Sequence, residues 1–566
     1  MKRWPIFFLL ILVFTLHFFR LSDIPPGLSN DEAANGYEAY SLYRTGADQW
    51  GNRFPLVLHG FGDDRLPMYS YLSIPFVAVF GLNAMAVRLL SVVSGIGLVF
   101  AMYLLGAVLV SERAGIFAAV LLSVTPWFFG MTRIAMETPL ALLFTLFFVL
   151  AFYRSSGHPV YYIWSILVAL LSMFTYHGSR LFVPLIGILL LADRIRSTGI
   201  RHVLAPFHSH KALGILTLAV AVMGAVLLGY AAFVDGGITR LQQVGITNDP
   251  TILDRQNMIR SACANALPST FCRIIGNEYV GYAVQFLMNF MHHFSLDFLS
   301  LNSDQAKGLL PPVGFFPLIV ILLAGYGALY IFSTQGYQQL KVLILGWLLF
   351  APIPDSLTGP GQYSRAFVLI PPIILLSAAG FSKISQIYRK LSYAVWGLIA
   401  VQTIMFFSLY FTYFPVYQAQ FTHNEYRLAA DYVKSLSPDT YSNVYMSRRF
   451  FDSKQYMFYL YYFQIDPRWY QQSGSKDWHM ESNGWIKVDR VGNWYFMDGL
   501  PGAGEVPDKS LFIGSQAEEV LPKVNSHELC TKFRVDLVSQ FYFPDGGKAF
   551  GVAQSNFQEN LPKECL

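Results

Sequence analysis

The sequence predicts an α-helical protein with many membrane spans and a smaller α/β domain at its C-terminal end. The 566-residue chain is 54% hydrophobic and only 13% charged, whereas soluble proteins usually contain about 25% charged residues. Its apolar residues gather in repeated runs of the length that a membrane helix needs, about 18 residues or more. From residue 416 onward no run reaches that length and charged residues become frequent.

The first apolar run, from Trp4 to Phe19, follows the basic residues Lys2 and Arg3. A basic start before an apolar run is typical of a signal peptide, but no small-residue cleavage site follows this run. We therefore expect a retained first span with a cytoplasmic N-terminus. A cleaved signal is the alternative.

About eleven spans are expected from the apolar runs. They cover approximately residues 4–20, 85–110, 114–131, 138–154, 160–177, 180–193, 212–233, 312–333, 341–358, 366–381 and 392–413. Residues 67–82 are also apolar, but the run is short and is bounded by Pro67 and Gly81. We expect this segment to be interfacial or re-entrant, because a full crossing needs about 20 residues.

Basic residues predict the orientation of the spans. With this count, the short connections on one side carry most of the Lys and Arg residues near the spans: Lys2, Arg3, Arg113, Arg154, Arg194, Arg196, Arg201, Lys211, Lys341, Lys383, Arg389 and Lys390. Such residues favour the cytoplasmic side. The predicted domains are a membrane domain of residues 1–415, with outer loops 21–84 and 234–311, and an extracytoplasmic α/β domain of residues 416–566, in a cell (inner or plasma) membrane.

The net charge of +5 is small for this length, so nucleic-acid binding is not indicated. All four cysteines, Cys263, Cys272, Cys530 and Cys565, lie in segments assigned to the outside. Disulfides persist in oxidising compartments, so we expect Cys263–Cys272 and Cys530–Cys565 bridges, with four free thiols as the alternative. Their spacing does not indicate a metal site.

The C-terminal domain has its own local signals. The spacing of apolar residues predicts a helix over Asn424–Leu436, and residues 442–447 and 485–497 are rich in strand-forming residues. Asp545-Gly546-Gly547 lies between two such runs within residues 533–552, which predicts a β-hairpin.

The outer loop 21–84 carries two acidic pairs, Asp31-Glu32 and Asp63-Asp64. Ser29 followed three residues later by Glu32 fits a capping box, which predicts a helix over Ala33–Tyr43 that stops at Gly46. The first pair therefore has a structural interpretation. A helix N-terminus also holds a carboxylate rigidly, so the same position suits a catalytic Asp31.

The second acidic pair leads into Arg65, Pro67 and Tyr69, at the entry to the short apolar segment. An Arg at this depth can bind a lipid phosphate through two parallel hydrogen bonds. An Asp–Arg surface pair before a helix is the alternative interpretation.

Further polar groups lie at the predicted outer edge of the spans. They are Arg133 and Glu137, His177 and Arg180, Asp355, and Tyr363 and Arg365. Each alone can be an interfacial anchor, but several clusters on one side of a membrane tend to mark a site. His292-His293 could bind a metal, although adjacent histidines point to different faces of a regular element, and a loop or interfacial role is the alternative.

Four stretches carry a resemblance to a known family: FGLNAMAVRLLSVVSG, TPWFFGMTRIAMETPLAL, TYHGSRLFVPL and QYSRAFVLIPP. Together with the first-loop Asp-Glu pair and their order along the chain, they resemble the bacterial branch of the GT-C superfamily. It includes protein O-mannosyltransferase-like and aminoarabinose-transferase-like enzymes that use polyprenyl-phosphate sugars. The resemblance covers about residues 5–415 and is weaker in the C-terminal domain.

The resemblance implies catalytic roles for Asp31, as the base, for Glu32 beside it, and for Asp64. Asp64-Arg65 matches an acidic-basic pair ahead of a proline-containing step, although Leu66 stands where a first proline is common. Contacts with the donor phosphate or the substrate are expected for a second set of residues: Arg65, Tyr69, Arg133, Glu137, His177, Arg180, Tyr363 and Arg365.

The expected activity is inverting transfer of a sugar from a polyprenyl-phosphate donor to a hydroxyl of a protein, lipid or glycan acceptor on the extracytoplasmic face. No cofactor is certain from the sequence, and a divalent metal held by first-loop carboxylates is one option. A polytopic transporter or lipid flippase is the alternative class. It predicts ionisable residues in the middle of spans and symmetry-related broken helices, whereas here the charges cluster at one edge.

Overall fold

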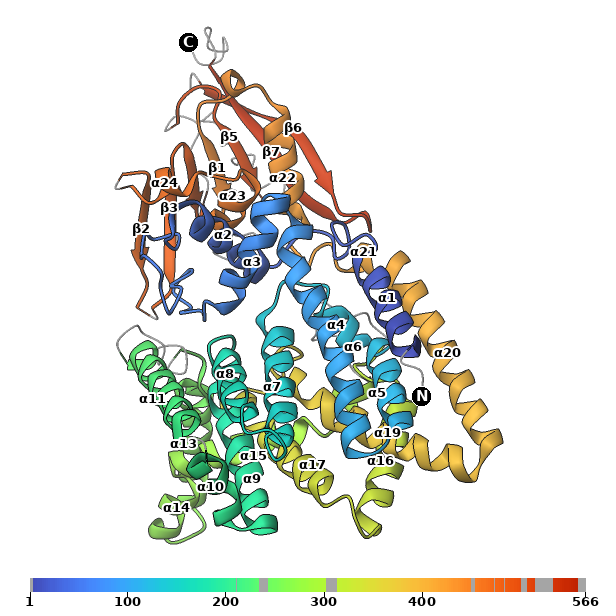
Figure 1. Ribbon diagram of the computed structural model, residues 1–566. Coiled ribbons are helices and arrows are strands. Elements are labelled where there is room, and N and C mark those ends of the chain that lie inside the picture. The colour runs from blue at the N-terminus through green and yellow to red at the C-terminus, as the bar shows by residue number, and fades with distance from the viewer. Residues whose placement is uncertain are drawn as a thin grey trace. The chain divides into compact units, whose positions relative to one another are not determined.

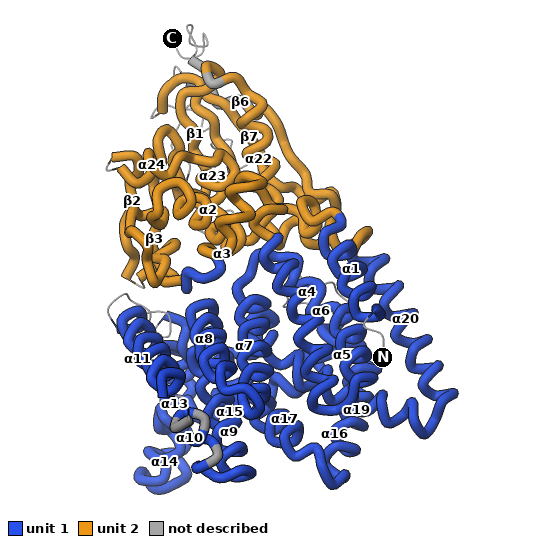
Figure 2. The backbone as a smooth tube through the Cα atoms, viewed as in Figure 1, with its two compact units in different colours: residues 1–19, 66–69, 89–410 blue, residues 20–65, 70–88, 411–566 orange. Residues whose placement is uncertain are grey.

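The computed structural model (Figure 1) describes residues 4–209, 211–233, 243–301, 313–448, 454–472, 474–482, 484–499, 506–514 and 533–557. The chain forms two compact units, coloured separately in Figure 2. Unit 1 contains residues 1–19, 66–69 and 89–410, and unit 2 contains residues 20–65, 70–88 and 411–566.

Unit 1 is helical in its described part. Helix α4 (Ala84–Leu109) begins in unit 2 and continues into unit 1. The other helices are α1 (Trp4–Phe18), α5 (Glu112–Ser123), α6 (Pro126–Met131), α7 (Glu137–Arg154), α8 (Tyr161–Met173), α9 (Ser179–Thr198), α10 (Ile200–Ser209), α11 (Lys211–Phe233), α13 (Pro250–Ala264), α14 (Ser269–Ile275), α15 (Glu278–His292), α16 (Leu318–Ser333), α17 (Gln338–Phe350), α18 (Ile353–Ser356), α19 (Ile370–Ile387) and α20 (Arg389–Thr412). Short 3₁₀ or π turns lie at Ile246–Asn248, Asp297–Leu301 and Ala366–Leu369.

Five stretches of described helix are long and apolar enough to cross a membrane, judged by length and composition: Ala84–Leu109, Glu137–Arg154, Lys211–Phe233, Ala366–Ile387 and Arg389–Thr412. The polytopic α-helical class is thus confirmed, while the count of eleven spans stays a prediction. The run expected at residues 114–131 is divided, because Pro126 begins α6 after a break. Proline lacks a backbone N–H and is favoured at the first position of a new helix.

The short apolar segment at residues 67–82 forms helix α3 (Met68–Phe80) with Pro75 inside it. Its 13 residues correspond to a length of about 20 Å. The hydrocarbon layer of a membrane is about 30 Å thick. The length of α3 therefore favours the interfacial or re-entrant location that the sequence predicts, and its depth in the membrane stays a prediction.

The core of unit 1 includes the contact between α16 and α19. An added Cβ at Gly380 would meet the Leu323 carbonyl oxygen and lie 2.9 Å from the backbone nitrogen of Gly327. Small residues let two membrane helices approach this closely, so that backbone and side chains pack over a large area. Next to Gly380 in α19, the Phe381 ring stacks on Phe117 of α5 with 3.9 Å between centroids.

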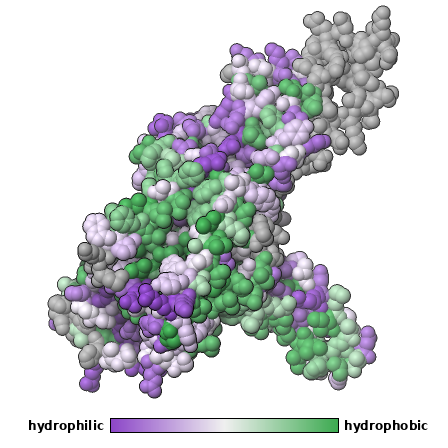
Figure 3. Space-filling model, turned by 90° about the vertical axis from the view of Figure 1, so that its right-hand side faces the viewer, coloured by the Kyte–Doolittle hydropathy of each residue, from purple (hydrophilic) through white to green (hydrophobic). Residues whose placement is uncertain are grey.

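Other helices of unit 1 present apolar side chains outward. In α11 and α20 most of the apolar residues are exposed. Figure 3 shows large areas of hydrophobic surface on the face that it displays. Since the free energy of exposing such helices to water is high, they fit contact with membrane lipid.

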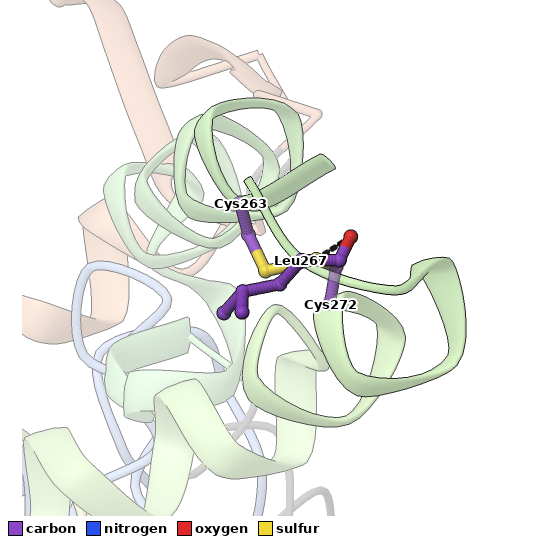
Figure 4. Close-up of a disulfide and its surroundings, with 3 residues drawn as sticks. All are labelled: Cys263, Leu267 and Cys272. Atoms are coloured by element: carbon purple, nitrogen blue, oxygen red, sulfur yellow. Dashed lines mark hydrogen bonds between the residues drawn. A yellow bond between two sulfur atoms is a disulfide. The ribbon is translucent and has the colours of Figure 1, made fainter. Parts of the chain in front are cut away.

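The second predicted outer loop forms α13, α14 and α15. A disulfide joins Cys263 at the end of α13 to Cys272 in α14, as predicted (Figure 4). Cys272 is buried, and its Sγ lies 3.6 Å from the Leu267 carbonyl oxygen. The predicted partners Cys530 and Cys565 lie outside the described residues.

Unit 2 contains a seven-stranded sheet with the order β2-β3-β4-β1-β5-β7-β6. The strands are β1 (Val444–Ser447), β2 (Lys476–Met480), β3 (Ile486–Val491), β4 (Trp494–Met497), β5 (Leu511–Gly514), β6 (Phe533–Tyr542) and β7 (Lys548–Phe557). Strand β1 pairs in parallel with β4 and β5. Strands β6 and β7 form the antiparallel hairpin predicted around Asp545-Gly546-Gly547.

The helices of unit 2 are α2 (Asn30–Thr45), α21 (Phe414–Tyr417), α22 (Asn424–Ser435), α23 (Gln455–Tyr462) and α24 (Pro467–Tyr470), together with most of α3. Helix α22 confirms the helix predicted from residue 424.

The first outer loop belongs to the same compact unit as the C-terminal sheet. The Tyr37 hydroxyl donates to the Ile465 carbonyl (3.0 Å), and the Ile486 N–H donates to the Phe61 carbonyl (2.9 Å). These hydrogen bonds join segments more than 400 residues apart in the chain. The loop that carries the candidate carboxylates is therefore supported by the C-terminal part of the chain, whereas its membrane side stays a prediction.

The close approach of α16 and α19 yields a test. We expect Gly380→Val to lower the thermal unfolding temperature in detergent, because forcing atoms into a packed core typically costs about 1–3 kcal/mol. Gly397→Val in α20 is the matched control, since an added Cβ there meets no atom within 4 Å. Equal unfolding temperatures for the two variants would contradict this packing.

Candidate functional site

The N-terminus of α2 forms the capping box that the sequence predicts. The Ser29 hydroxyl accepts a hydrogen bond from the Glu32 N–H (3.2 Å), and the Glu32 carboxylate accepts one from the Ser29 N–H (3.0 Å). The helix ends at Gly46, whose φ of 69° is the left-handed conformation that glycine adopts easily. These caps fix both ends of the helix that carries Asp31.

Glu32 also forms a buried ion pair with Arg88 of α4. Its Oε1 accepts from the Arg88 Nε at 2.8 Å, and the two side chains are 1% and 0% exposed. Arg88 further donates to three backbone carbonyls: Leu21, Pro25 and Gly27. These contacts favour a structural role for Glu32 over the catalytic one expected from its position beside Asp31.

Arg88 was not among the candidate residues. The available signal was a single Arg inside the apolar run 84–109, where a charge is costly unless it is paired. The sequence contains that signal but does not identify the partner, because Glu32 lies 56 residues away.

Asp31 is held by Arg65. The Arg65 Nη2 donates to the Asp31 Oδ1 at 2.5 Å, and its Nε donates to the Asp63 Oδ2 at 2.5 Å. Arg65 and Asp63 are buried, whereas the Asp31 side chain is 46% exposed. The guanidinium also lies over the Phe61 ring, 4.5 Å from its centroid. The cluster thus contains one solvent-accessible carboxylate, that of Asp31, which the buried Arg65 guanidinium holds in place.

Within the second acidic pair, Asp63 contacts Arg65 and Asp64 lies beside His59. Asp64 has a φ of 44°, and its Oδ1 lies 2.9 Å from the Nδ1 of His59. The Asp63–Arg65 pair is buried, so it is not a surface pair. A catalytic role for Asp64 stays a prediction.

A further carboxyl group, Glu38, lies in the same unit and was not a candidate. It is fully buried in α2, and its Oε2 accepts from the Gln49 N–H at 3.0 Å. Burial, and next the neighbouring Asp48 carboxylate, raise the pKa of Glu38 well above its usual value. One helix therefore carries carboxyl groups in two different environments, Glu38 buried and Asp31 accessible.

In unit 1, Arg133 holds the end of α1. Its guanidinium donates to the carbonyls of Leu16, His17 and Phe19, at 2.6 to 3.0 Å, and to the Tyr410 hydroxyl at 3.2 Å. Carbonyls at a helix C-terminus lack partners within the helix, and a cation there is favourable. These contacts favour a structural role, and the expected contact of Arg133 with a donor phosphate stays a prediction.

The other predicted residues of unit 1 lie on several elements. The Tyr69 hydroxyl is buried and lies 2.8 Å from the Ser91 Oγ, Glu137 begins α7, and His177 lies between α8 and α9. The Arg180 Nε donates to the Met173 carbonyl at 3.4 Å. The backbone carbonyl of Tyr363 accepts from the Trp127 Nε1 at 2.8 Å. Their predicted contacts with a substrate stay predictions.

Arg365 follows a turn that begins at Asp355. The Arg365 Nη1 donates to the Thr358 hydroxyl at 2.5 Å and lies 3.8 Å from the Asp355 Oδ1. The Asp355 side chain also forms a hydrogen bond with His293. This contact was not predicted from the sequence. Within the part of the chain that the structure describes, no group of three His, Cys, Asp or Glu residues is arranged to hold a metal ion.

Residues 64–228 match the family model described as dolichyl-phosphate-mannose-protein mannosyltransferase. A search of curated protein sequences found no match. The crystal structure of ArnT from Cupriavidus metallidurans bound to undecaprenyl phosphate is similar over 98% of this chain and 98% of that chain, with a TM-score of 0.50 and 11% identity. The chain has the GT-C fold. At this identity the structural likeness shows the fold alone, and this is the fold that the resemblance in the sequence implies.

Two further structures have lower scores. ArnT from Cupriavidus metallidurans in the apo state matches with a TM-score of 0.47 and 11% identity, over 96% of this chain and 97% of that chain. The archaeal oligosaccharyltransferase AglB from Archaeoglobus fulgidus, in complex with an inhibitory peptide and a dolichol-phosphate, matches with a TM-score of 0.47 and 12% identity, over 99% of this chain and 75% of that chain.

The buried ion pair gives a stability prediction. We expect Arg88→Met to destabilise the protein by about 3–5 kcal/mol, because the Glu32 charge is left buried without its partner. Asp477→Asn is the control: it breaks an exposed Asp–Arg pair (Asp477–Arg490), which is worth about 0–1 kcal/mol. Thermal or denaturant unfolding measures both changes. A small effect of Arg88→Met, equal to that of the control, would contradict the importance of the pair.

The raised pKa of Glu38 gives a pH dependence. In the unfolded chain a Glu ionises near about pH 4.3, whereas in the folded protein Glu38 keeps its proton to a higher pH. Its contribution to stability is therefore complete below about pH 4 and is lost as the pH rises toward the folded-state pKa. We expect the unfolding temperature of Glu38→Gln, relative to the wild type, to increase from pH 5 to pH 8. A difference that stays constant with pH would refute the assignment.

Proposed function

We propose that the protein is an integral-membrane glycosyltransferase that moves a sugar from a polyprenyl-phosphate donor to a hydroxyl acceptor on the extracytoplasmic face. Three observations support the reaction class: the GT-C fold, the family match over residues 64–228, and the likeness to the ArnT whose crystal structure contains bound undecaprenyl phosphate. The observation that carries the residue assignment is the accessible Asp31 carboxylate, fixed at a helix N-terminus by a buried Arg65.

Asp31 is the proposed base. It removes the proton from the acceptor hydroxyl while the hydroxyl oxygen attacks the anomeric carbon of the sugar. The bond from that carbon to the phosphate oxygen breaks, and polyprenyl phosphate leaves with the bonding electrons. A single displacement of this kind inverts the anomeric centre. A positioned base typically contributes about 10²–10⁴-fold to the rate.

The arrangement of Arg65 modifies its expected role. Its contacts with Asp31 and Asp63 support a function in orienting the base, because a guanidinium fixed by a second, buried carboxylate has little freedom to move. The positive charge of Arg65 would also stabilise the negative charge that develops on the departing phosphate. Arg365 of unit 1 is proposed as a further residue that contacts the donor phosphate. The acceptor is a protein, a lipid or a glycan.

The base assignment is tested with Asp31→Asn. We expect release of polyprenyl phosphate from a panel of lipid-phosphate sugars, including mannose and aminoarabinose derivatives, to fall by about 10²-fold or more. The unfolding temperature should change little, because Asp31 is half-exposed and the capping box depends on Ser29 and Glu32. Mass spectrometry of the lipid products measures the release.

Asp477→Asn serves again as the control, since it removes one carboxylate from an Asp–Arg pair in the same unit. Near-normal release by Asp31→Asn would show that another group is the base. A wild-type protein that moves a lipid-linked sugar across vesicle membranes without releasing polyprenyl phosphate would instead favour a transporter or flippase.

A further inference from the structure

Asp355 organises the turn that carries Arg365. Its carbonyl oxygen accepts from the N–H groups of Thr358 (2.9 Å) and Gly359 (3.1 Å), and its Oδ2 accepts from the Gln362 N–H at 2.8 Å. The side chain is 1% exposed. One buried residue therefore ties down residues 358–362, the segment immediately before Arg365.

The same carboxylate is bonded to the second predicted outer loop. The Nε2 of His293, at the C-terminal end of α15, lies 3.1 Å from the Asp355 Oδ2, and its Nδ1 lies 2.8 Å from the Asn289 carbonyl oxygen. Asn289 in turn donates to the Ser356 carbonyl at 3.1 Å. Two hydrogen bonds thus join α15 to α18.

Both ring nitrogens of His293 face oxygen atoms that accept hydrogen bonds. A neutral imidazole has one N–H and can donate to only one of them. The imidazole therefore lies between the backbone of α15 and the Asp355 side chain, which fixes the ring at this junction.

Arg365 brings a guanidinium close to the Asp355 side chain. Its Nη1 lies 3.8 Å from the Asp355 Oδ1, which has no hydrogen-bond partner among the described residues. The Arg365 side chain is 23% exposed. A partly exposed guanidinium on a turn that a buried residue holds in place is suited to bind an anion.

We infer that His293 and Asp355 are positioning residues that hold Arg365 for the phosphate of a lipid donor. This inference rests on the proposed function and gives the second outer loop a part in it: α15 supplies the imidazole that fixes the turn. His293 and Asp355 act through Arg365. A phosphate bound there is recognised by the guanidinium, whose planar fork matches phosphate oxygens.

The test measures binding of undecaprenyl phosphate to the full-length protein in detergent, by the ligand-induced rise in unfolding temperature. We expect Arg365→Gln, His293→Gln and Asp355→Asn each to weaken binding about tenfold. His292→Gln is the matched control, because it removes the neighbouring imidazole, which has no hydrogen bond to Asp355 among the described contacts. This control should bind as the wild type does.

A double-variant cycle separates positioning from a general structural effect. If His293 acts through Arg365, His293→Gln added to Arg365→Gln causes no further loss of binding. If the two substitutions instead reduce the binding affinity by independent factors that multiply in the double variant, the inference is overturned. It is also overturned if the Arg365→Gln variant binds undecaprenyl phosphate as tightly as the wild type does. In the transfer assay the same variants should raise the KM for the lipid donor about tenfold with kcat changed less than about twofold, because they weaken donor binding.

Where His293→Gln unfolds, Asp355→Asn keeps the inference testable. An Asn side chain that donates from Nδ2 to His293 Nε2 keeps the contact with α15, but it cannot also accept the Gln362 N–H at that position, so the hold on residues 358–362 is weakened. Wild-type binding by a folded Asp355→Asn would overturn the inference. Its failure is distinct from failure of the proposed function, since a wild type that binds undecaprenyl phosphate but transfers no sugar contradicts only the latter.

Discussion

The buried ion pair between Glu32 and Arg88 fixes the part of unit 2 on which the candidate site depends. Taking two charges out of water costs several kcal/mol per ion unless their remaining donors and acceptors are satisfied. Here Arg88 also donates to the carbonyls of residues 21, 25 and 27, and Glu32 also accepts from the Ser29 N–H. The pair therefore joins the start of α4, the turn after the first helix and the start of α2. Asp31 immediately precedes Glu32, so the pair also fixes its position.

Around this ion pair, the carboxylates of the first outer loop differ by their surroundings. Glu32 and Asp63 are buried against Arg88 and Arg65, Glu38 is buried with a raised pKa, and Asp31 is accessible. A buried charge needs a partner, so these groups are constrained by folding before any chemistry is considered. Only a carboxylate that is both held and accessible can exchange a proton with a substrate, which is why Asp31 is the proposed base.

The arginines of unit 1 are distinguished by the same reasoning. Sequence position put Arg133 and Arg365 in one group, as basic residues at the predicted outer edge of the membrane. Arg133 is buried and its guanidinium donates to three carbonyls at the end of α1, so it completes a helix terminus. Arg365 is partly exposed beside the buried Asp355–His293 pair, which leaves it better suited to bind an anion. Contacts of the guanidinium, not location in the sequence, separate the two roles.

The sequence by itself determined what depends on composition and on short separations along the chain. Apolar runs predicted the helical membrane class, Ser29 and Glu32 predicted the cap of α2, Asp545-Gly546-Gly547 predicted the β6–β7 hairpin, and Cys263–Cys272 closes a separation of 9 residues. Only the tertiary structure decided the partners across long separations: Arg88 for Glu32, His293 for Asp355, and the C-terminal sheet for the first loop. It also decided that Arg65 contacts Asp63. Asp64, whose φ is positive, lies beside His59 instead of following a regular strand or helix. Periodicity encodes which face of a helix is apolar, but it does not specify which distant charge will meet another, since that depends on how all the elements pack together.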